Sequence, residues 1–106
     1  QPTQQDNAQA LRARVTQARR RQLRRQGQLN CWLHGAALRD QIVQADLAPS
    51  FLTNALQQFQ LSARSYHKVW RIARSIADLE DATSISQTHM TEALGFRSLP
   101  WEQGTK

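Results

Sequence analysis

The clearest pattern of apolar and polar positions lies in residues 62–79. If successive residues advance by about 100°, as in an α-helix, they divide into two arcs of about 180° each. The first arc holds Ser65, Tyr66, Val69, Trp70, Ile72, Ala73, Ile76, Ala77 and Leu79. The second holds Arg64, His67, Lys68, Arg71, Arg74, Ser75 and Asp78. So wide an apolar face predicts the central helix of a bundle, beginning at Ser62.

A thinner stripe predicts a first helix over residues 7–26, with Asp6 or Asn7 as its cap and Gly27 as its end. The stripe consists of Ala8, Leu11, Val15, Ala18 and Gln22, with Leu23 beside it. Arginines occupy most of the other faces. We therefore expect this helix to be stable only when it docks on a neighbouring element.

Further helical patterns lie on either side of the central helix. They are a short helix over 36–43, one from Pro49 to about residue 59, and one that follows Ser86 and reaches Phe96. Glycine and proline are too scarce (4 and 3 residues) for the many turns of an all-β fold. The fold class predicted is all-α, a four- to five-helix bundle.

We expect one helical domain over residues 7–97, after a disordered lead-in (1–6) and before a flexible tail (98–106) in which Trp101 can dock. No apolar run is long enough for a membrane span, and the polar N-terminus is unlike a signal peptide. The single cysteine, Cys31, fits a reducing cytoplasm and is expected to be a small, semi-buried residue. Because the chain begins with Gln1, we expect it to be a fragment of a longer protein.

The net charge of +6 is concentrated in the first 30 residues, which hold seven arginines against Asp6, while acids and bases balance in the rest. Such a segment can neutralise phosphates of a nucleic acid. The candidate contacts are Arg19, Arg20, Arg21, Arg24 and Arg25. Two other interpretations remain open: a solvated face, or a helix packed on an acidic neighbour in a longer protein.

Arg64 lies in the first turn of the central helix, where the helix dipole favours anions over cations. An arginine beside free backbone N–H groups suits a phosphate better than it suits helix stability. Lys68 and Arg71 continue the same ridge. The alternative is that Arg64 is an ordinary solvated residue.

Motifs of catalysis and metal binding are missing from the sequence. There is no glycine-rich phosphate loop, nucleophile elbow or paired-histidine spacing. The interpretation is that His34, His67 and His89 are solvated or capping residues. Trp32, Trp70 and Trp101 are expected to be core or docking aromatics.

The run LSARSYHKVWRIARSIADL, residues 61–79, closely resembles the C-terminal domain of magnesium-chelatase-related proteins, the ComM/YifB-like AAA+ ATPases. The resemblance covers about residues 10–97. Its other matching positions are Arg12 to Val15, Ala18-Arg19, Gln22, Asn30, Ile85, His89, Glu92 to Leu94, and Phe96-Arg97. Ser65, Trp70 and Ser75 depart from the family, which more often has alanine, an aliphatic residue and threonine there; these changes affect packing.

The resemblance implies an AAA+ lid that follows a nucleotide-binding core in the same chain. Arg64 resembles the sensor-2 arginine, which reaches the γ-phosphate of ATP. Family members are similar to hexameric motors, and ComM-type members act as DNA branch-migration helicases in natural transformation. ATP and Mg²⁺ are then bound mainly by the core, with Lys68 and Arg71 beside Arg64. The chain itself lacks the Walker motifs and an arginine finger, so we expect no ATP hydrolysis by it alone.

Overall fold

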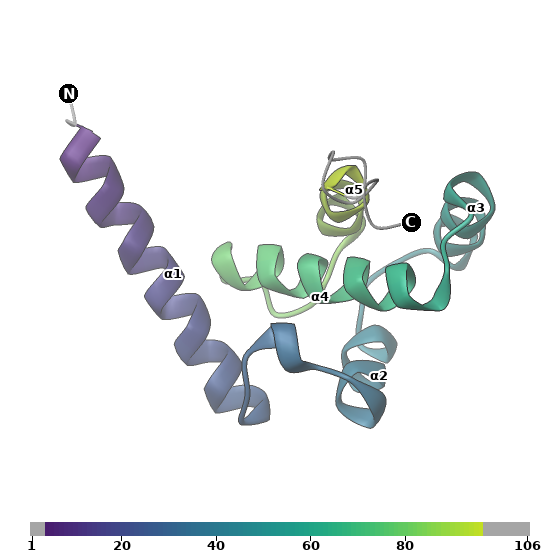
Figure 1. The fold of residues 1–106 in the computed structure, drawn as a ribbon, viewed down its shortest axis with the longest axis horizontal. Helices are drawn as coiled ribbons and strands as arrows, with labels where there is room; N and C mark the ends of the chain where they lie inside the picture. The colour runs from purple at the N-terminus through teal and green to yellow at the C-terminus, as the bar shows by residue number, and fades with distance from the viewer. Residues whose placement is uncertain (1–3, 97–106) are drawn as a thin grey trace.

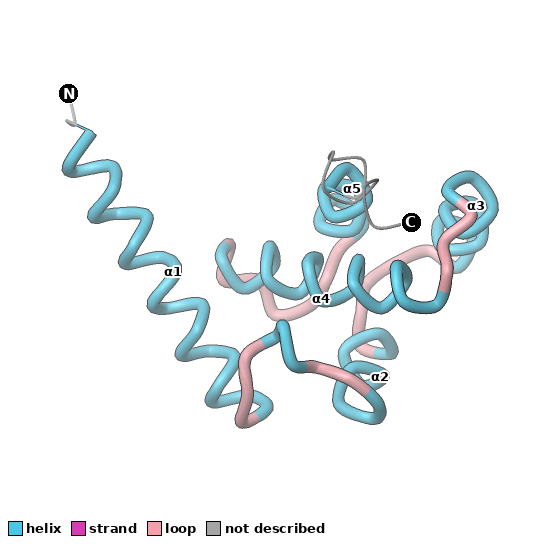
Figure 2. Tube along the Cα trace, viewed as in Figure 1, coloured by secondary structure: helices cyan, strands magenta, loops and turns pink. Residues whose placement is uncertain are grey.

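The computed structural model describes residues 4–96, and their side chains from Asn7 onward, as helices grouped around one central helix (Figure 1). The elements are α1 (Gln4–Gln26), the 3₁₀ helix η1 (Asn30–Trp32), α2 (Gly35–Val43), α3 (Pro49–Phe59), α4 (Ala63–Leu79) and α5 (Gln87–Phe96). Strands are missing from this part of the chain, as Figure 2 shows, apart from an isolated bridge between Asp46 and Ser86. The predicted all-α class is confirmed.

Helix α4 is the centre of the arrangement, as its wide apolar face predicts. It contacts α1, η1, α2 and α5. In Figure 1, α5 lies on one side of α4, η1 and α2 lie on the other side, and α1 crosses near the C-terminal end of α4. The domain is therefore built mainly by packing α1, η1, α2 and α5 against this one helix.

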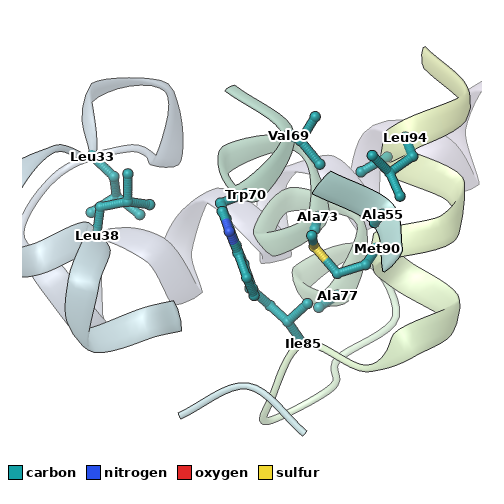
Figure 3. Packing of buried hydrophobic residues seen from close by; sticks show 11 residues of the cluster. Leu33, Leu38, Ala55, Val69, Trp70, Ala73, Ala77, Ile85, Met90 and Leu94 are labelled. Carbon is teal, nitrogen blue, oxygen red and sulfur yellow. The ribbon is translucent and has the colours of Figure 1, made fainter. Parts of the chain in front are cut away.

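The hydrophobic core surrounds Trp70, whose side chain is fully buried (Figure 3). Its indole ring meets Tyr66 edge to face, with ring centroids 6.2 Å apart. The other buried apolar residues of this cluster are Leu33, Leu38, Ala55, Val69, Ala73, Ala77, Ile85, Met90, Ala93 and Leu94. The expectation that Trp70 is a core aromatic is confirmed. Trp32, in contrast, is 67% exposed.

Short-range hydrogen bonds fix the helix ends that the sequence predicted. The Ser62 side chain accepts from the Ser65 backbone N–H (3.1 Å) and caps α4. At the start of α5, the Ser86 backbone N–H donates to Nδ1 of His89 (2.9 Å), so His89 acts as a capping residue. Gly27 follows α1 with a φ of 76°, a left-handed conformation that glycine adopts without strain.

The first helix begins at Gln4, three residues earlier than predicted, and the tail with Trp101 lies outside the described residues. The expectation of a semi-buried Cys31 was wrong: its turn η1 leaves the thiol exposed. Among the described residues, no helix is both long enough and apolar enough to cross a membrane.

Candidate functional site

The ridge of three basic residues on α4 lines a surface pocket of about 550 Å³. Arg64, Lys68 and Arg71 are brought together there, as their helical spacing predicted. The rest of the lining is Cys31 from η1, Ile72, Ser75, Ile76 and Leu79 from α4, and Phe96 from the end of α5. The pocket thus runs along α4 from a basic half to an apolar half.

Arg64 is exposed and lies in the first turn of α4. No hydrogen bond or ion pair joins the Arg64 guanidinium to another residue whose side chain the structure describes. At this helix end, the Ser62 hydroxyl accepts from the Ser65 backbone N–H, and the Ser62 carbonyl accepts from the Tyr66 backbone N–H. The backbone N–H groups of Ala63 and Arg64 therefore have no partners within the helix. A cation and the positive end of a helix dipole therefore face the same space.

Lys68 and Arg71 are half-buried along the same ridge. One terminal nitrogen of Arg71 donates to the Leu33 carbonyl at 3.3 Å, which ties the ridge to the segment after η1. This bond holds the Arg71 guanidinium near the pocket and leaves its other donors for a ligand. The arrangement suits an anion with several oxygens, such as a polyphosphate.

A metal site is a separate question. Among the residues that are described, no three histidine, cysteine or acidic side chains come together in a way that could hold a metal ion. The pocket lining contains cations, a thiol and a hydroxyl, which do not suit Mg²⁺.

A second polar cluster, buried, joins α1 to the far end of α4. The carboxylate of Asp78 is 1% exposed and accepts from Arg25 at 2.8 and 3.1 Å. It also pairs with Arg74 at 3.0 Å, one helical turn earlier, and accepts from the Asn30 amide at 2.8 Å. One carboxylate thus pairs with two guanidinium groups. We call Arg25, Asn30, Arg74 and Asp78 together the Asp78 cluster.

Arg74 is 2% exposed, although it lies on the polar arc of α4. Its terminal nitrogens donate to the Ala82 carbonyl (2.8 Å), the Thr83 carbonyl (3.1 Å) and the Gln41 side chain (3.2 Å). Burial lowers the pKa of the Arg74 guanidinium, while the Asp78 carboxylate acts in the opposite direction. Near the C-terminal end of α4, the polar arc therefore also packs against other elements. The buried groups there are the ion pair of Arg74 and Asp78 and not apolar side chains.

The five arginines proposed for nucleic-acid binding fall into two groups: two have partners within the chain, and three are exposed. Arg21 donates to the Asp78 carbonyl (2.8 Å) and pairs with Asp81, and Arg25 belongs to the Asp78 cluster. Arg21 and Arg25 are thus engaged by groups of the same chain, and their contact with a nucleic acid stays a prediction. Arg19, Arg20 and Arg24 are exposed. The expectation that the first helix docks on a neighbour is confirmed, and the neighbour is α4.

The sequence analysis assigned no site role to three polar residues, Gln22, Asn30 and Gln41. All three are buried, and the Gln22 side chain accepts from the Asn30 backbone N–H at 2.9 Å. The only sequence signal was the spacing of Arg74 and Asp78, which favours an ion pair along one helix. That spacing does not reveal that other elements cover the pair.

The sequence comparisons agree with this architecture. The profile of the family described as "Magnesium chelatase, subunit ChlI C-terminal" matches residues 5–97, nearly the whole described range. The chain belongs to this family. The matched range includes both the pocket and the Asp78 cluster, so both lie within a magnesium chelatase C-terminal domain.

Curated relatives match over most of this magnesium chelatase C-terminal domain. The competence protein ComM of Haemophilus influenzae is 35% identical over 84% of the chain, and the uncharacterized protein YifB of Escherichia coli is 30% identical over 89%. YifB of Salmonella typhimurium is 33% identical over 89%. The chain spans only 18–19% of the length of these relatives. No solved structure matches it significantly.

Proposed function

We propose that this domain is the lid of an AAA+ ATPase and that Arg64 contacts the terminal phosphate of ATP held on a core domain of the same polypeptide. One observation carries the proposal: the exposed Arg64, with no partner among the described side chains, lies in the first turn of α4 and in one pocket with Lys68 and Arg71. An arginine kept at the positive end of a helix is explained by an anionic ligand.

Each residue of the ridge has a separate part in this proposal. Arg64 donates to the phosphate end, where charge accumulates during phosphoryl transfer. Lys68 and Arg71 add positive potential that orients the remaining phosphates. ATP supplies the reacting phosphoryl group, and Mg²⁺ is held by the core, because the lid lacks a suitable ligand set in its described residues.

The full-length protein, in this proposal, is a hexameric motor that remodels DNA as a branch-migration helicase in natural transformation. The name of the Haemophilus influenzae relative, a competence protein, supports this. The lid's own contribution is to respond to bound ATP and to move relative to its core.

The test is ATP turnover by the full-length protein with Arg64→Ala. Loss of one charged hydrogen bond to the phosphate should lower kcat about 10- to 100-fold, which corresponds to about 1.5–3 kcal/mol. The control is Arg39→Ala, which removes another exposed arginine from α2. Circular dichroism checks that both variants stay folded.

Near-normal turnover by the folded Arg64→Ala protein would reject the phosphate contact. An equal loss in Arg64→Ala and Arg39→Ala would also reject it, because the effect would then come from the overall charge of the lid.

Duplex DNA is the second candidate ligand, and one observation favours it. Five arginines on α1 are exposed and have no acidic partner among the described side chains: Arg12, Arg14, Arg19, Arg20 and Arg24. Such a surface would bind the phosphate backbone without regard to sequence.

Salt-dependent anisotropy with labelled duplex DNA tests this second function. Arg19, Arg20 and Arg24 changed together to glutamine should lower the slope of log K against log salt by about 0.9 for each phosphate contact removed. Arg39→Gln should leave the slope unchanged. Absence of binding by the unaltered chain at low salt would reject this function.

A further inference from the structure

The N-terminal half of α1 presents an apolar stripe that the domain leaves uncovered. Leu11 is 55% exposed and Val15 is 39% exposed. On a helix of about 100° per residue, both lie within about 60° of Ala18, which is 3% exposed where α1 meets α4. The same stripe is therefore buried in one half of the helix and open in the other.

Contacts between α1 and the rest of the domain stop part-way along the helix. Among the hydrogen bonds that described side chains of α1 make to other elements, the first along the helix is a long one from Arg14 to the Leu79 carbonyl, at 3.4 Å. The stronger ones come from Arg21 and Arg25, near the C-terminal end of α1. Figure 1 shows the N-terminal turns of α1 extending away from α4 into open space.

We propose that Ala8, Leu11 and Val15 dock on an apolar surface, rimmed by acidic groups, of the core domain that precedes this lid in the same polypeptide. The inference rests on the proposed function, since it needs that core. The stripe continues an established interface, because Ala18 and Gln22 on the same face are already buried against the domain.

The position of the domain within its family identifies the occupant. The family profile describes a C-terminal domain, and the matching relatives are about five times longer than the matched segment. In such proteins the remaining polypeptide joins the domain at α1, the first helix. A covalently joined core therefore meets α1 at a high effective concentration, which favours it over a separate molecule.

The charges around the stripe specify the chemistry of the core surface. Arg12 and Arg14 lie roughly 80° to either side of the midline between Leu11 and Val15. Arg12 is exposed, and the one contact of Arg14 is the long bond to Leu79. An apolar centre with acidic groups on both rims complements this pattern, as is common at protein interfaces.

Hydrogen exchange on the full-length protein tests the docking. Amides of residues 8–15 should exchange about tenfold more slowly in the full-length protein than in the isolated domain, because docking suppresses local opening of the helix. Leu11→Ser should abolish the extra protection. Leu23→Ser is the matched control, since Leu23 is 52% exposed on the same helix but lies about 100° from the stripe.

Equal exchange of residues 8–15 in the two proteins would overturn the inference. Protection that rises with the concentration of the isolated domain would overturn it in favour of a second copy, and protection that requires added DNA would overturn it in favour of nucleic acid. Hydrogen exchange tests the docking, and ATP turnover tests the phosphate contact. If Arg64→Ala still lowers ATP turnover while the amides of residues 8–15 stay unprotected, the docking proposal is rejected and the proposed lid function is retained.

Discussion

Asp78 carries an unusual electrostatic load for one side chain. It is almost fully buried, yet it faces the guanidinium groups of both Arg25 and Arg74. Arg74 itself is buried at 2% exposure, so its charge depends on this carboxylate. Removing one member of a buried ion pair leaves an uncompensated charge in a poorly solvated place, which costs far more than losing a surface pair.

Asp78→Asn should lower the free energy of unfolding by about 3–5 kcal/mol, because Arg74 then keeps a buried charge without a counter-charge. Asp81→Asn is the control: Asp81 pairs with Arg21, its side chain is 74% exposed, and asparagine tolerates its positive φ. Its loss should cost at most about 1 kcal/mol. Urea unfolding followed by tryptophan fluorescence measures both; similar losses would contradict this account.

Sequence reasoning at single positions succeeded for apolar residues and failed for paired polar ones. Trp70 and Ala73 were placed in the core because helical spacing aligns them with other apolar residues. Arg74 and Asp78 were placed on the polar arc, because helical spacing alone cannot show that two opposite charges cancel and are covered by α1 and η1. The ridge from Arg64 to Arg71 was found because it depends only on spacing along one helix.

Elements were predictable where their ends carry local signals. Ser62 and Ser86 precede α4 and α5, and Pro49 begins α3. The 3₁₀ helix η1 was not among the predicted elements, since its conformation depends on contacts such as that of Asn30 with Asp78. The partner of α1 could not be deduced either, because the contacts come from arginines whose acceptors lie over fifty residues away.

The end of α1 provides a test at the scale of elements. Gly27 has a φ of 76° and open space around its α-carbon, so Gly27→Ala adds backbone strain without a clash. We expect a loss of about 1–2 kcal/mol in the free energy of unfolding. Gly95→Ala, in α5 with nothing within 4 Å of the added carbon, should instead stabilise by about 0.4–1 kcal/mol.

Thermal or urea unfolding of the two alanine variants measures this difference. Destabilisation of similar size at both glycines would contradict the assignment of left-handed strain to Gly27 alone.

At the scale of the whole domain, α1 has two halves with different duties. Its C-terminal half closes the Asp78 cluster, while its N-terminal half contributes little to the domain's own packing. Among the exposed arginines of the same helix, Arg12 and Arg14 flank the docking stripe, whereas Arg19, Arg20 and Arg24 follow the stripe toward the C-terminal end of α1. Core docking and DNA binding would therefore compete for Arg12 and Arg14 but not for the other three.

Two truncations separate these halves. Deletion of residues 1–12 should change the free energy of unfolding by less than about 1 kcal/mol, as for surface changes in general. Deletion of residues 1–26 removes Arg25 from Asp78 and uncovers the buried cluster, so it should cost about 3 kcal/mol or more. Urea titration of the isolated domain gives both values, and an equal cost for the two deletions would show that α1 stabilises the domain along its whole length.

The placement of Asp78 on α4 has a mechanical consequence. Arg64 and Asp78 lie near opposite ends of one uninterrupted helix, about 21 Å apart at 1.5 Å per residue. Movement of the Arg64 end by about 1 Å, with the other end fixed, tilts this rod by about 3°. Because Arg25 fastens α1 to the far end, α1 turns with the tilt. If the proposed lid function holds, the domain acts as a lever, with the proposed phosphate contact at one end of its arm and the proposed link toward the core at the other.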